Sequence, residues 1–95
     1  MPHNILWTEE ALFDLHVITD YLSQRSVAAS ERVAYSIAAS VEALTDFPRI
    51  GRIGTRPDTR ELLLTDYPYL VVYRIRDDVI GIVRVFHMAQ DRDNA

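Results

Sequence analysis

Arginine and tyrosine recur in the second half of this chain in a pattern suited to binding an anionic molecule. The segment TRELLLTDYPYLVVYRIR, residues 59–76, contains three arginines and three tyrosines among apolar residues typical of β-strands. The planar guanidinium group of arginine forms paired hydrogen bonds with carboxylate or phosphate, and it is seldom buried without a partner. We therefore expect some of these arginines to lie on a surface that meets another molecule.

A histidine follows the last apolar run, and its position near an arginine suits acid–base cleavage of RNA. His87 lies three residues after Arg84, and Arg60 begins another apolar run. In such chemistry a histidine transfers protons while arginines stabilise the charge that develops on phosphate. The alternative is structural: His87 hydrogen-bonds a neighbouring loop and fixes the chain end. If the protein is a nuclease, its catalytic candidates are Arg60, Arg84 and His87.

Other enzyme classes leave no signature in the chain. It lacks the H-E-x-x-H, P-loop, G-x-G-x-x-G and G-x-S-x-G motifs. There is no cysteine, and His3, His16 and His87 are too scattered in the sequence to suggest a metal site. We therefore expect neither a metal nor a cofactor.

Charge is distributed unevenly along the chain. The formal net charge is −4, which argues against binding nucleic acid through bulk charge. Residues 1–46 hold two arginines and seven acidic residues, whereas residues 47–95 hold eight arginines and seven acidic residues. All ten basic residues are arginine, which a GC-rich genome would also produce. The loop PRIGRIGTRPDT carries Arg49, Arg52 and Arg56, and its GRIG segment indicates a chain reversal or, alternatively, an anion site.

The first half of the chain has helical periodicity after a short apolar segment. Residues 3–7 are typical of a strand, and apolar residues at helical spacing follow in two segments. Thr8 and Ser26 are suitable N-caps for these helices. Pro48 disfavours helical geometry at Phe47, so the second helix should end near there.

The second half predicts strands and, with the helices, one domain over residues 1–95. Three strands are expected at residues 60–65, 69–76 and 79–87, because these runs are rich in Val, Ile, Leu and Tyr. The predicted fold is α+β: a helical hairpin packed on one face of a small antiparallel sheet, in the order β-α-α-β-β-β.

Turn geometry predicts which side chains share a face of this sheet. A two-residue turn at 77–78 would place Tyr73 opposite Ile82. We expect the uncovered face to bind a partner through Arg60, Leu62, Tyr69, Tyr73, Arg84 and Phe86. The face beneath the helices should carry Leu63, Leu70, Val72, Val83 and Val85. We expect Arg74 and Arg76 to be solvated charges at the hairpin end, paired with the turn aspartates.

A succession of motifs along nearly the whole chain is more specific than any one of them. Its segments are WTEEALFDLHVITDYLSQRS, RVAYSIAASVEALTDFPRIGRIG, TRELLLTDYPYLVVYRI and VIGIVRVFHMAQD. The positions that carry the pattern are Pro48, Gly51, Arg60-Glu61-Leu62, Tyr69, Tyr73-Arg74, Val85 and His87. In order and spacing the chain resembles the toxins of the RelE/ParE superfamily, from bacterial type II toxin–antitoxin modules.

This resemblance implies a small cytoplasmic toxin and a protein partner. The partner is a cognate antitoxin, whose C-terminal segment folds as it wraps the toxin, so a toxin–antitoxin hetero-oligomer is expected. The family fold, a helical hairpin against a small antiparallel sheet, agrees with the fold predicted from periodicity. The chain has no apolar stretch long enough to span a bilayer, and no membrane association is expected.

The superfamily divides by target, and the resemblance favours one branch. ParE-like members inhibit DNA gyrase, whereas RelE-like members cleave ribosome-bound mRNA with basic residues on the sheet and often a late tyrosine. The long helical hairpin, the PRIGR loop and the RVFH ending look more like ParE. The chain also has no lysine and no tyrosine after Tyr73, so part of the RelE chemistry has no counterpart. We expect gyrase as the target; the alternatives are a ribosome-dependent mRNA endoribonuclease and a non-toxic module that only binds antitoxin.

Overall fold

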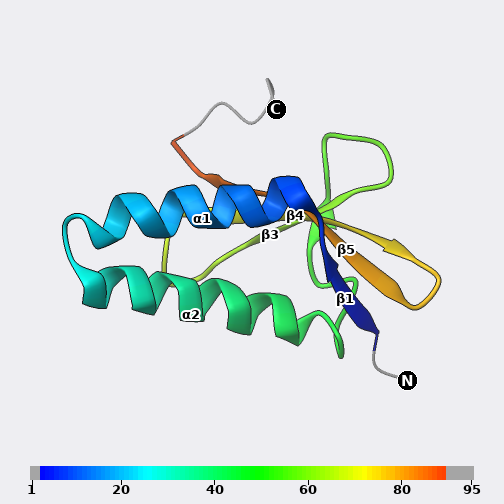
Figure 1. Ribbon diagram of the computed structural model, residues 1–95. Coiled ribbons are helices and arrows are strands. Elements are labelled where there is room, and N and C mark those ends of the chain that lie inside the picture. The colour runs from blue at the N-terminus through cyan, green and yellow to red at the C-terminus, as the bar shows by residue number, and fades with distance from the viewer. Residues whose placement is uncertain (1–2, 90–95) are drawn as a thin grey trace.

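The computed structural model describes residues 3–89, which form two helices and a five-stranded sheet (Figure 1). The order is β-α-α-β-β-β-β, so the predicted α+β fold is confirmed, with one short additional strand contributed by the arginine-rich loop. The elements are β1 (Asn4–Trp7), α1 (Glu9–Ser23), α2 (Val27–Ala43), β2 (Arg52–Ile53), β3 (Arg60–Leu63), β4 (Tyr69–Arg76) and β5 (Val79–His87).

Both helices begin at the predicted caps. Thr8 Oγ1 accepts a hydrogen bond from the backbone N–H of Ala11 at 3.1 Å, and Ser26 Oγ accepts one from the N–H of Ala29 at 3.1 Å. Each cap satisfies a backbone donor that the first helical turn leaves unpaired. Within residues 3–89, neither helix combines the length and the apolar character needed to cross a bilayer.

The sheet is mixed rather than wholly antiparallel. Its strand order is β1-β5-β4-β3-β2, and β1 runs parallel to β5 while the other neighbours are antiparallel. A parallel pair needs a long connection, and here both helices and three strands lie between β1 and β5 in the sequence. The expected antiparallel meander of β3, β4 and β5 is confirmed.

The predicted register holds in β3 and in the β4–β5 turn. Arg60 pairs with Tyr73 across β3 and β4. Arg76 pairs with Val79, so the turn has two residues, and Asp77 has a φ of 55°. Asp tolerates this left-handed conformation better than most side chains, which suits the twist of a tight hairpin.

A β-bulge overturns part of the predicted face assignment. The register shifts by one residue between Val72 and Tyr73, so Arg84 pairs with Val72 and not with the predicted Val71. Because side chains alternate along a strand, this shift moves Arg84 and Phe86 to the face opposite Tyr73.

The helices cover the face that was predicted to bind a partner. Tyr69 and Tyr73 are only 6% and 0% exposed, and they belong to the core with Ile37 and Val41 of α2. The prediction that this face is open is therefore wrong. Both faces carry apolar side chains, so alternation alone did not distinguish them. The buried core comprises Ala11, Val33, Ile37, Val41, Leu44, Leu64, Tyr69, Val71, Tyr73, Ile80, Ile82 and Val85.

Candidate partner-binding surface

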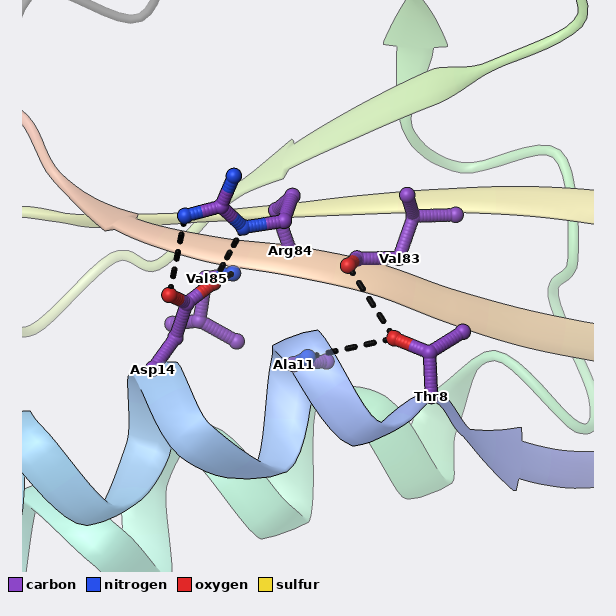
Figure 2. Close-up of polar contacts among 6 residues, drawn as sticks. All are labelled: Thr8, Ala11, Asp14, Val83, Arg84 and Val85. Atoms are coloured by element: carbon purple, nitrogen blue, oxygen red, sulfur yellow. Dashed lines mark hydrogen bonds and ion pairs between the residues drawn. The ribbon is translucent and has the colours of Figure 1, made fainter. Parts of the chain in front are cut away.

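Arg84 is held by an ion pair with α1 (Figure 2). Its Nε and Nη2 donate to the two carboxylate oxygens of Asp14 at 2.7 and 3.0 Å. The hydrogen bond to Asp14 raises the pKa of Arg84 above its ordinary value, although desolvation opposes the shift. The guanidinium carbon also lies 4.7 Å from the centre of the Phe86 ring. Arg84 is therefore charged, but its charge is offset by Asp14.

Side chains at the start of α1 hydrogen-bond the backbone of β5 beyond the point where β1 ends. β1 pairs with β5 only as far as Ile82. Beyond it, the carbonyl of Val83 accepts a hydrogen bond from Thr8 Oγ1 at 3.1 Å, and the N–H of Val85 donates to Asp14 at 2.9 Å (Figure 2). These backbone groups would otherwise need water or another strand. The contacts fix α1 to the sheet.

Arg60 and Tyr73 hold the backbone of the loop that follows α2. Arg60 Nη1 donates to the carbonyls of Gly51 and Arg49 at 2.7 and 3.3 Å. The Tyr73 hydroxyl donates to the carbonyl of Pro48 at 2.7 Å and accepts the N–H of Gly51 at 2.9 Å. Burial raises the pKa of Tyr73. Both side chains therefore have a structural role in this loop, and partner binding by Arg60 stays a prediction.

The loop arginines do not form an evident anion site. Arg52 Nη2 lies 3.2 Å from a carboxylate oxygen of Glu61, which is buried. The other carboxylate oxygen of Glu61 accepts the N–H of Thr55 at 3.4 Å. Arg49 is exposed and Arg56 is half-buried. A buried carboxylate bonded to this loop disfavours phosphate beside it, because like charges repel.

The three nuclease candidates are not brought into one site. His87 pairs with Tyr69, whereas Arg60 pairs with Tyr73, four residues further along β4. Four residues of strand span about 13 Å. The His87 ring meets the Tyr69 ring edge-on, with centroids 5.1 Å apart. Arg84 lies on the other side of the sheet from Arg60.

The outer face of the sheet, opposite the helices, combines apolar and arginine side chains. Arg74 Nε is buried and has no hydrogen-bond partner within residues 3–89, so Arg74 is not simply a solvated charge. Arg76 pairs at 3.6 Å with Asp58, not with the turn aspartates as predicted. The apolar side chains of this face are Leu63, Leu70, Val72, Val83 and Phe86.

An apolar stripe on α1 was not among the predicted site residues. Phe13, Val17 and Tyr21 are 65%, 49% and 54% exposed. Residues four apart share one face of a helix, so the three side chains form a continuous row. The guanidinium of Arg25 stacks on Tyr21 at 4.8 Å. Such a row on a small protein is typical of an interaction surface.

Other residues in these contacts were also missed from the sequence. Asp14 follows the buried Ala11 by three residues, and this spacing could have signalled a carboxylate at the edge of the packed side. Glu61 and Arg74 gave no comparable signal, because the burial of Glu61 and of Arg74 Nε depends on segments that only the fold brings together. Within residues 3–89 there is no group of three or more His, Cys, Asp or Glu side chains placed to hold a metal ion.

Comparison with known sequences identifies relatives over most of the chain. A family model described as the ParE toxin of the type II toxin–antitoxin system parDE matches residues 5–92. Putative toxin Y4kP of Sinorhizobium fredii is 42% identical over 86 residues, covering 90% of this chain and 88% of the relative. Toxin RelE2 of Caulobacter vibrioides is 36% identical over 86 residues, covering 90% of this chain and 96% of the relative.

Solved structures share the same arrangement of helices and strands. A chain of the chromosomal ParDE TA system from P. aeruginosa matches with a TM-score of 0.81 and 25% identity, covering 90% of this chain and 95% of that one. A chain of the intact E. coli RelBE toxin–antitoxin complex matches with a TM-score of 0.61, covering 94% of this chain and 99% of that one. At 18% identity, the second likeness concerns the fold alone. With its family match spanning almost the entire sequence, this chain belongs to the ParE toxin family of type II toxin–antitoxin systems.

Proposed function

We propose that this toxin arrests growth in the cytoplasm by binding DNA gyrase, and that a cognate antitoxin protein holds it inactive in a hetero-oligomer. The observation that carries the gyrase target is the separation of the nuclease candidates Arg60, Arg84 and His87. Arg60 bonds loop carbonyls, Arg84 is ion-paired with Asp14, and His87 lies about 13 Å from the Arg60 end of β4. Concerted acid–base chemistry on one phosphate needs these groups within hydrogen-bond reach of the same atoms.

The exposed apolar side chains support action through protein binding. Protein interfaces are anchored by buried aromatic and arginine side chains and do not need proton-transfer groups. Phe13 and Tyr21 of the α1 stripe supply such aromatic anchors, and Arg25 stacks on Tyr21 beside them. ParE-like toxins inhibit DNA gyrase, and membership in the ParE family supports the same target here. The ParDE and RelBE assemblies among similar structures support an antitoxin partner.

A ribosome-dependent mRNA endoribonuclease is the second candidate function. The relative named Toxin RelE2 shares 36% identity with this chain, which favours a RelE-like activity. On that alternative, Arg60, Arg84 and His87 would have to converge on RNA when the ribosome binds, together with loop arginines such as Arg49, Arg52 and Arg56.

Controlled expression with two separate readouts tests the target. We expect induction to stop growth, to relax plasmid DNA and to leave mRNA 5′ ends unchanged. His87→Ala should remain toxic, since this histidine has no part in a binding mechanism, and circular dichroism of the purified variant provides the control for folding. New mRNA 5′ ends inside codons, abolished by His87→Ala in a folded protein, would instead establish the nuclease. If expression of folded wild-type protein is harmless, the chain is a non-toxic module that only binds antitoxin.

A further inference from the structure

A hollow of about 360 Å³ lies on the outer face of the sheet. It involves the β4–β5 hairpin, which projects past the start of α1 in Figure 1. Three strands contribute to it. Leu6 of β1 pairs with Gly81 of β5, and Gly81 pairs with Arg74 of β4, so these residues form one row across the sheet. Arg76 and Glu10 also line it. We name this feature the Gly81 hollow.

Gly81 leaves the middle of this row without a side chain. A Cβ built there would meet only Arg74 Cγ, at 3.7 Å, which is ordinary van der Waals contact. The fold therefore does not require glycine at this position for lack of space. Glycine inside a strand sacrifices packing and often marks the close approach of a ligand or another backbone. The gap between Leu6 and Arg74 has room for an apolar side chain of a partner.

The arginines of the hollow retain donors for an anion. Arg74 Nε is buried without a hydrogen-bond partner within residues 3–89. A buried donor left unpaired is unfavourable, and a carboxylate that reached it would relieve this cost. Arg76 is joined to Asp58 at 3.6 Å, but both side chains are largely exposed, and such pairs exchange readily.

Charge around the hollow favours a single carboxylate over a polyanion. Glu10 lines the hollow itself, and the turn residues Asp77 and Asp78 follow Arg76 directly. These carboxylates and the net charge of −4 would repel a nucleic acid strand. One Asp or Glu side chain with an apolar neighbour matches the two arginines beside exposed Leu6.

We propose that the Gly81 hollow binds an acidic, apolar segment of the antitoxin. A carboxylate of that segment accepts hydrogen bonds from Arg74, and the apolar side chain beside it lies over Gly81 against Leu6. The inference rests on the proposed antitoxin partner and identifies where one of its segments is recognised.

Binding of the full-length cognate antitoxin tests this site by calorimetric titration. Arg74→Gln removes the charged donor, and Gly81→Val fills the gap. Each should weaken binding at least about tenfold, as expected for loss of a charged hydrogen bond or of an apolar contact. Arg32→Gln and Ala38→Val make matched changes on the exposed surface of α2, and their affinity should stay within about twofold of wild type. Arg74→Gln should also flatten the salt dependence of binding.

Toxicity distinguishes a variant that has lost its contact with the antitoxin from a variant that does not fold. Cells that express Arg74→Gln or Gly81→Val should still stop growing, and co-expressed antitoxin should rescue them less well than it rescues wild type. If Gly81→Val does not fold, Gly81→Ala is used in the same assay, because its Cβ would make an ordinary van der Waals contact with Arg74. An antitoxin that fails to bind wild type would refute the proposed partner. An antitoxin that binds wild type and all hollow variants equally would refute only the role of the hollow.

Discussion

Replacing Asp14 with alanine should destabilise the fold by about 2–3 kcal/mol, because one carboxylate joins α1 to β5 through three hydrogen bonds. It accepts Arg84 Nε at 2.7 Å, Arg84 Nη2 at 3.0 Å and the N–H of Val85 at 2.9 Å. The substitution leaves the guanidinium without its carboxylate and leaves a strand-edge donor without an acceptor.

The magnitude follows from the exposure of the pair. A hydrogen bond to a charged group contributes about 1.5–3 kcal/mol when it is well buried. The side chains of Asp14 and Arg84 are 12% and 24% exposed, so solvent screens the pair in part and the lower end applies. The unsatisfied N–H of Val85 adds about 1 kcal/mol. For a chain of this size the total corresponds to a fall in Tm of roughly 10–20 °C.

Urea denaturation followed by circular dichroism measures this effect. Asp20→Ala is the matched control, because Asp20 is exposed on the same helix and, within residues 3–89, its side chain bonds only Gln24, at 3.4 Å. The control should change the free energy of unfolding by less than about 0.5 kcal/mol. A double-mutant cycle with Arg84→Ala should give a coupling of about 1–2 kcal/mol. If Asp14→Ala matches the control, or if the coupling is zero, α1 is not held to β5 by this ion pair.

Two further predictions concern the buried tyrosines. Tyr73→Phe removes the hydroxyl that bonds Pro48 and Gly51. It should lower the free energy of unfolding by about 1–2 kcal/mol and speed hydrogen exchange at the Gly51 amide. An unchanged urea midpoint would contradict this role of the hydroxyl. Burial raises the pKa of Tyr69 and of Tyr73 above the usual 10.0, which favours the neutral phenols in the fold. The stability they contribute is complete below about pH 10 and is lost as the pH rises through the folded pKa. Ultraviolet titration should therefore find two of the five tyrosines ionising late, and five tyrosines ionising together would oppose the structure.

Features that depend on sequence neighbours were predictable. Thr8 and Ser26 cap helices because each side chain reaches a backbone donor three residues on. The two-residue turn before Val79 follows from adjacent aspartates between apolar strands. The register of β3 against β4 followed from the turn length assumed between them.

The exposed face of the sheet was predicted wrongly because the features that decide it leave no local signal in the sequence. The bulge at Val72 and Tyr73 inserts one extra residue into β5, and every residue there is an ordinary strand former. This bulge by itself places Arg84 on the face of the sheet opposite Tyr73. Tyrosine on a strand is equally compatible with an interface and with a core, because its hydroxyl can bond when buried. Here the acceptor is the carbonyl of Pro48, 25 residues away in the sequence.

Long-range pairing also explains what was missed at the ends of the sheet. β1 lies beside β5, although the two strands are separated by most of the chain. Because β1 lies there, Leu6 lines the Gly81 hollow. Because β1 ends at Trp7, the backbone groups of Val83 and Val85 bond Thr8 and Asp14 instead of another strand. The arginine-rich loop was predicted as a connection, but its residues Arg52 and Ile53 extend the other edge of the sheet as β2.

The most direct test of the central claim is a supercoiling assay with purified DNA gyrase and purified toxin, in the absence of ribosomes. Growth arrest through gyrase predicts that increasing toxin abolishes supercoiling and that stoichiometric antitoxin restores it. Full supercoiling at saturating toxin, with cleavage of mRNA when ribosomes are supplied to the same preparation, would contradict that claim.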